Sequence, residues 1–144
     1  MKFLSARYSR RDILKVATST AIVSITSAFS SGCSPKIADL ETIAIEMTGE
    51  LNHPQKAREI GAVQLAGIPL DQHQPYEELT RELLLTLKLI PEEVTVDTLL
   101  TLNTRLSTQV RQDFADENVV IVDSWMLSGT EVKLCILAAT MALI

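Results

Sequence analysis

Residues 128–143 read SGTEVKLCILAATMAL and contain the most sharply defined helix of the chain. Ser128 lies three residues before Glu131, directly ahead of an apolar run, which is the pattern of a capping box. Beyond Lys133 every side chain is uncharged, so the predicted helix, roughly Gly129 to Leu143, is apolar almost all round. Such a helix is too short to span a membrane. It is either the centre of a helical core or partly buried against another subunit.

Four more helices are predicted upstream, because apolar residues recur there at intervals of three and four. Their ranges are residues 37–51, 54–66, 75–90 and 97–115, with prolines at 54, 75 and 91 marking boundaries. The longest has an apolar spine that consists of Leu99, Leu102, Leu106, Val110 and Phe114. The β-prone run at 119–122 has no evident pairing strand, so we expect an extended connector or a single edge strand there.

The predicted fold class is therefore all-α, a small bundle of about five helices with at most one short extended segment near 119–122. Charge divides the chain further. Residues 1–33 carry five basic residues and one acidic residue, a net charge of +4, whereas residues 34–144 carry eight and seventeen, a net charge of −9. We expect a basic leader at 1–33 and a single helical domain at 34–144. The acidic domain also argues against a nucleic-acid partner.

The leader resembles a twin-arginine translocation signal, and it is followed by a 14-residue uncharged stretch at 16–29. Ile13 stands where this signal usually has Phe, and the other fixed positions match. The alternative is an amphipathic first helix of the domain. Export by this route implies that the twin-arginine translocase is a transient partner, that the cargo is already folded, and that the destination is the periplasm or its membrane face. The signal residues are Ser9, Arg10, Arg11, Ile13, Leu14 and Lys15.

Two processing sites compete at the end of the leader. Residues 31–33, Ser-Gly-Cys, resemble the end of a lipoprotein box in which Cys33 would carry a lipid, although Ser30 occupies the position where Leu is expected. Residues 28–30, Ala-Phe-Ser, fit ordinary cleavage before Ser31. A third interpretation makes Cys33 an incidental linker residue. A single lipid binds membranes only marginally, so firm attachment through Cys33 would need a second contact.

The domain offers little for catalysis. His53 and His73 lie in polar turns beside prolines, where solvated side chains are the expected role, and Cys135 lies among apolar neighbours, as a small buried hydrophobe does. Acidic pairs at 77–78 and 92–93 stand at predicted helix starts, where they complement the helix dipole. Phosphate-loop, dinucleotide, haem and metal motifs are missing from the sequence. We expect a non-enzyme without cofactor or metal of its own.

A cluster of large apolar side chains precedes the last helix. The lone tryptophan of the chain begins it. Packing in the core is one interpretation; anchoring a partner protein is the other, because tryptophan is enriched among interface hot spots. The candidate partner interface consists of Trp125, Met126 and Leu127.

These features together resemble the small (gamma) subunit of membrane-bound FAD-dependent sugar and polyol dehydrogenases, such as sorbitol and glucose dehydrogenases. The resemblance rests on the twin-arginine leader, on a first helix that ends at residues 47–49, Met-Thr-Gly, and on a second helix rich in Ala and Gly. The family often has Leu-Thr-Gly at that helix end, and Met47 replaces the Leu. Residues 121–131 resemble a later family segment in which an aromatic residue precedes a Thr/Tyr-Glu helix start. The resemblance covers the leader and about half of the domain.

The resemblance implies a non-catalytic accessory subunit that binds a large FAD-carrying catalytic subunit and escorts it, folded, across the membrane. Arg10 and Arg11 would then serve export for both chains. The chain differs from the family in Cys33 and in its short body, which leaves the choice of partner open. The alternative is a stand-alone periplasmic protein, or lipoprotein, that acts as a binding or structural module.

Overall fold

The computed structural model describes residues 34–144, and the predicted export signal and Cys33 lie outside the described residues. The described part is all-α with one small hairpin, which confirms the predicted fold class. Two short 3-10 turns, Leu70–Gln72 and Pro91–Glu93, separate helices. The main elements are α1 (Leu40–Gly49), α2 (Pro54–Ala66), α3 (Tyr76–Thr86), α4 (Val96–Ala115), β1 (Val119–Val122), β2 (Trp125–Ser128) and α5 (Gly129–Met141).

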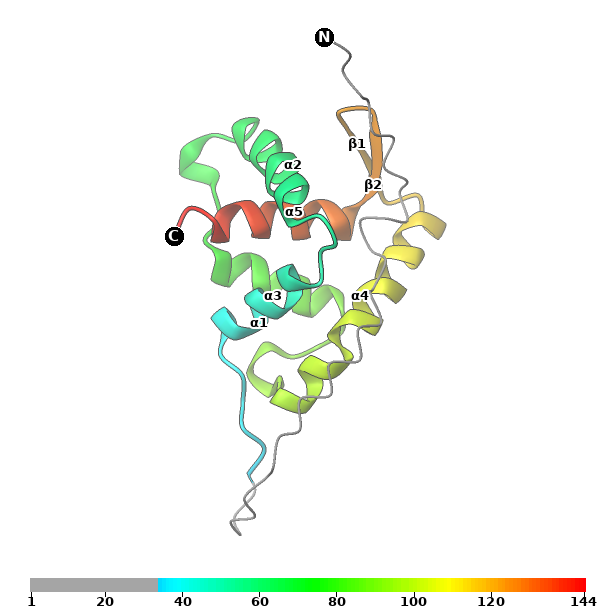
Figure 1. Ribbon diagram of the computed structural model, residues 1–144. Coiled ribbons are helices and arrows are strands. Elements are labelled where there is room, and N and C mark those ends of the chain that lie inside the picture. The colour runs from blue at the N-terminus through cyan, green and yellow to red at the C-terminus, as the bar shows by residue number, and fades with distance from the viewer. Residues whose placement is uncertain (1–33) are drawn as a thin grey trace.

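Helix α5 is the central element of the fold. Figure 1 shows it crossing the middle of the molecule, with α2 on one side and α1 and α3 on the other. It packs against all four other helices, and eight of its thirteen residues are buried. Leu134 and Leu137 are fully inaccessible to solvent. The core interpretation of the last helix therefore applies to most of its surface.

The closest approach in this core is between α2 and α5, at Gly61. A methyl group added at Gly61 would lie 2.0 Å from the carbonyl oxygen of Cys135 and 2.9 Å from the Cβ of Ala139. Both distances are far inside van der Waals contact, so only glycine lets the two backbones approach this closely. Gly61 was not predicted as a packing residue, because periodicity scores side chains and glycine has none.

The segment after β1 differs from the prediction of an unpaired extended run. Residues 125–128 form a second strand, antiparallel to β1, with Val120 opposite Leu127 and Val122 opposite Trp125. The two-residue loop, Asp123 and Ser124, has positive φ at both positions, 49° and 66°. This backbone geometry is typical of a tight two-residue hairpin turn, in which the sequence Asn-Gly is strongly preferred. Because the sequence has Asp-Ser at this turn instead, the strand pairing was not predicted.

Several predicted inward positions are in fact exposed. Helix α3 ends at Thr86 rather than Ile90, because Lys88 adopts a left-handed φ of 58° and Leu89 donates its N–H to the carbonyl of Leu84 at 2.9 Å. This Schellman-type ending turns the chain out of the helix. Phe114, the last residue of the predicted apolar spine, is 37% exposed. Other apolar residues within the predicted helix ranges are also more than a third exposed: Ile37, Val63, Leu85 and Ile90.

Candidate functional site

A buried polar junction lies where α4, the hairpin and α5 meet. The predicted capping box is confirmed: Ser128 accepts a hydrogen bond from the N–H of Glu131 at 3.0 Å, and Glu131 accepts from the N–H of Ser128 at 2.7 Å. Asp113 reaches across from α4 and accepts from the N–H of Thr130 at 2.8 Å. It also accepts from the side-chain amide of Gln109 at 2.9 Å. The side chains of Glu131 and Asp113 therefore cap backbone N–H groups at the amino end of α5.

The two carboxyl groups respond to burial in opposite directions. Burial raises the pKa of Asp113, but the hydrogen bonds donated by Thr130 and Gln109 outweigh burial, and the net pKa is lowered. Burial also raises the pKa of Glu131, and there it prevails over the bonds from Ser128, with the negative charge of Asp113 adding to the rise. Asp113 is 3% exposed and Glu131 is 6% exposed. These partners belong to the fold itself, so the junction serves as a structural clamp.

The candidate interface residues are placed on different faces of the hairpin. Leu127 and Val122 are each 3% exposed and anchor the inward face, and Trp125, on that same face, packs half-buried against the core. Met126 pairs with Ile121 on the opposite face. Ile121 is 71% exposed, and Met126 is half-buried. The outward face of the hairpin therefore presents an apolar pair of side chains on a rigidly anchored base.

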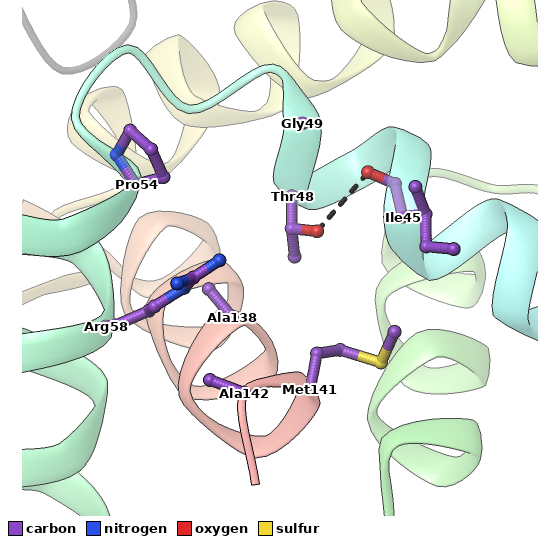
Figure 2. A pocket seen from close by; sticks show the side chains of 8 residues that line it. All are labelled: Ile45, Thr48, Gly49, Pro54, Arg58, Ala138, Met141 and Ala142. Carbon is purple, nitrogen blue, oxygen red and sulfur yellow. Dashed lines mark hydrogen bonds between the residues drawn. The ribbon is translucent and has the colours of Figure 1, made fainter. Parts of the chain in front are cut away.

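A pocket of about 360 Å³ opens between the end of α1, the start of α2 and the last turns of α5. Figure 2 shows the Arg58 side chain extending from α2 over the pocket, toward Ala138 of α5. Thr48 donates its hydroxyl hydrogen to the carbonyl of Ala44 at 2.8 Å. The lining residues are Ile45, Thr48, Gly49, Pro54, Arg58, Ala138, Met141 and Ala142. The pocket is mainly apolar with a guanidinium at its rim, which suits an apolar group that carries a negative charge.

The pocket includes two of the three residues at 47–49, the end of α1, on which part of the family resemblance rests. Thr48 and Gly49 line it, whereas Met47 is fully buried in the core. Sequence reasoning identified this helix end but not the pocket, because Arg58 and Met141 come from distant parts of the chain.

The two histidines and the described cysteine were predicted to be non-catalytic. The imidazole of His73 is half-buried and donates its Nε2 hydrogen to the carbonyls of Leu65 and Ile68, both at 3.0 Å, so it closes the end of α2. It is thus a structural link rather than a simply solvated turn residue. Burial raises the pKa of the Cys135 thiol to about 12, with the charge of Glu131 contributing. Within residues 34–144 no cluster of three potential metal ligands occurs.

None of the helices described between residues 34 and 144 has the length and apolar character needed to cross a bilayer. No protein-family model, curated protein or solved structure matches the chain. The geometry above is therefore the basis for a functional assignment.

Proposed function

We propose that this chain is a non-catalytic accessory subunit that resembles the small subunit of FAD-dependent sugar and polyol dehydrogenases. It carries the twin-arginine signal at residues 9–15 and escorts a folded, FAD-containing catalytic subunit to the periplasmic side of the membrane. The chain itself would hold no cofactor. The observation that carries the proposal is the outward face of the hairpin, where Ile121 and Met126 expose apolar surface that the core does not need.

The hairpin is suited to docking because its base is rigid. Two of its inward side chains, Val122 and Leu127, are buried in the core. Gly129 donates its N–H to the carbonyl of Asn118 at 2.9 Å, which ties the two strand ends together. A preorganised apolar surface loses little conformational entropy when a partner covers it. Ile121 and Met126 would form the centre of the contact, because central apolar residues dominate binding energy.

Co-purification tests this proposal. The full chain is co-expressed in a twin-arginine-competent bacterium with the protein encoded by its neighbouring gene, and FAD absorbance is measured in the periplasmic and membrane fractions. We expect Arg10→Lys with Arg11→Lys to leave both proteins in the cytoplasm. Ile121→Asp should abolish co-purification of the flavoprotein while export of the small chain continues. Leu70→Asp is the matched control, because Leu70 is 85% exposed and lies outside the hairpin.

An unchanged location of the flavoprotein in the double-arginine variant would refute the escort role. Retention of the flavoprotein by the Ile121→Asp variant would refute the hairpin as the docking surface.

The pocket beside Arg58 favours the second candidate function, a stand-alone periplasmic binding module. Its volume is within the range of small-molecule sites, and Arg58 could hold an acidic ligand. An anionic apolar dye, anilinonaphthalene sulfonate, is the probe. Saturable fluorescence that is lost in Arg58→Ala, together with failure to co-purify any flavoprotein, would select the binding module over the accessory subunit.

A further inference from the structure

The first described residues are fixed to one end of α4. Ala38 donates its N–H to the carbonyl of Val94 at 2.8 Å, and Val96 donates its N–H to the carbonyl of Lys36 at 3.2 Å. Ile37 pairs with Thr95 in an isolated antiparallel bridge between these bonds. Figure 1 shows this segment leaving α1 and running to the end of the molecule where α4 begins. The point at which the chain enters the domain is therefore set by backbone hydrogen bonds.

The same end of the molecule exposes large apolar side chains. Val96 and Leu100 are four residues apart on α4, so they lie on one face of the helix. Ile90 precedes the short turn that leads into α4. The exposed fractions are 60% for Ile37, 54% for Ile90, 49% for Val96 and 83% for Leu100. We call these four residues the tether end. Large apolar side chains exposed at one end of a small domain are a candidate contact surface.

The position of Cys33 identifies what would cover this surface. Cys33 is four residues before Ile37 in the sequence, and four residues of chain can reach at most about 14 Å, at about 3.6 Å per residue. A lipid on Cys33 would therefore bring a bilayer to the tether end. A single lipid needs a second contact for stable attachment, and four exposed apolar side chains could provide one.

We propose that the tether end is a membrane-facing surface that inserts its apolar side chains at the lipid interface beside the lipid on Cys33. The inference rests on the export and lipid attachment named above. The contact is apolar rather than electrostatic, because the nearby charges are mostly acidic. They are Lys36, Glu92, Glu93 and Asp97, with Glu92 in an ion pair with Arg81 at 2.5 Å. Anionic lipid would therefore not strengthen the contact.

This arrangement assigns opposite ends of α4 to the two partners. The helix begins at the tether end, and the hairpin follows its other end after a short turn. Its twenty residues span about 30 Å at 1.5 Å per residue. A catalytic subunit docked on the hairpin would be held at about that distance from the membrane surface.

Vesicle flotation tests the inference with the full chain, exported and purified in detergent. Phosphatidylcholine vesicles are used with and without phosphatidylglycerol. The variant is Ile37→Gln with Leu100→Gln, and the matched control is Ile121→Gln, which removes an equally exposed apolar side chain from the hairpin. We expect the double variant to bind roughly tenfold or more weakly, the control to bind normally, and phosphatidylglycerol to give no gain. Cys33→Ala in the wild-type background should also weaken binding.

Two further readouts separate this inference from the proposed function. Mass spectrometry of the mature chain determines whether Cys33 carries a lipid, and an unmodified Cys33 would overturn the membrane contact. Unchanged flotation of the double variant, or stronger binding on anionic vesicles, would overturn it as well. Co-purification of the flavoprotein depends on the hairpin and should survive in the double variant, so the accessory role could stand even if the membrane contact failed.

Discussion

Charged side chains are usually exposed and large apolar side chains are usually buried. The start of α5 is an exception of the first kind, and the tether end and the hairpin are exceptions of the second kind. At the start of α5 two carboxylates are buried, each satisfied by hydrogen bonds from the fold. Near the start of α4 and on the hairpin that follows its other end, large apolar side chains are exposed, such as Leu100 and Ile121. The first departure is explained within the molecule, because the buried groups hold three elements together. The second is not explained by contacts within residues 34–144, and the two proposed contact surfaces rest on it.

The strongest test of the central region is Gly61→Ala. The new methyl group would meet the backbone of α5 at 2.0 Å, so α2 and α5 must move apart. We expect the free energy of unfolding to fall by roughly 3 kcal/mol or more. Urea denaturation of the full chain, followed by circular dichroism, measures it.

Gly49→Ala is the control, because Gly49 has nothing within 4 Å of an added methyl and ends helix α1. It should be neutral or stabilising by about 0.5–1 kcal/mol. Equal stability of the two variants would show that α2 and α5 do not cross as closely as described.

A smaller loss is expected from Asp113→Ala. It removes the acceptor for Thr130 and Gln109 and leaves the buried N–H of Thr130 without its partner, at a cost of about 2–3 kcal/mol. Asp116→Ala is the comparison, because Asp116 also accepts from a glutamine four residues earlier, Gln112, but is exposed. It should change stability by less than about 0.5 kcal/mol. Similar losses from both variants would remove the special role assigned to the junction.

The two buried carboxyls should affect the pH dependence of stability with opposite signs. The pKa of Asp113 is lowered in the folded state, so its contribution is present above the ordinary aspartate pKa of 3.8 and is lost as the pH falls through the folded pKa. The pKa of Glu131 is raised, so its contribution is present below 4.5 and is lost as the pH rises through the folded pKa.

Difference curves of unfolding free energy against pH for Asp113→Asn and Glu131→Gln measure these two contributions. Relative to the wild type, Asp113→Asn should flatten the loss of stability in acid, and Glu131→Gln should flatten the loss above pH 4.5. Slopes of the same sign in both difference curves would contradict the opposite assignments.

Elements with strong local signals were predictable, and features made by tertiary contact were not. The capping box at residues 128–131 is local, and it was predicted correctly. The hairpin was missed because its turn uses Asp123 and Ser124 instead of glycine. On α4, Phe114 was predicted to be inward, but Asp113 is buried there, because its carboxylate is required at the start of α5. Binary patterning assigns a charged residue to the solvent side, so it could not anticipate this.

The candidate sites divide in the same way. The sequence shows residues 125–127 as a run of large apolar side chains. Which of them faces outward depends on the strand register, so the sequence alone could not show that Met126 faces outward and Leu127 inward. The pocket beside Arg58 draws on α1, α2 and α5, and no single stretch of sequence signals it. The tether end likewise depends on the bridge between Ile37 and Thr95, which joins residues far apart in the chain.

The smallest expected effect on stability is that of Leu100→Ala, and its comparison with Leu102→Ala tests the contrast between the two regions. Leu100 and Leu102 are two residues apart on α4, and they are 83% and 2% exposed. Leu102→Ala should cost about 2–5 kcal/mol, because it leaves a cavity in the core. Leu100→Ala should cost less than about 0.5 kcal/mol, because Leu100 is almost fully solvated already. Urea midpoints of the two variants provide the measurement. A side chain this exposed, with no role in stability, is free to take part in the contact proposed for the tether end. If Leu100→Ala destabilised the isolated chain as Leu102→Ala does, the tether end would be part of the core, and the contrast between the two regions would no longer hold.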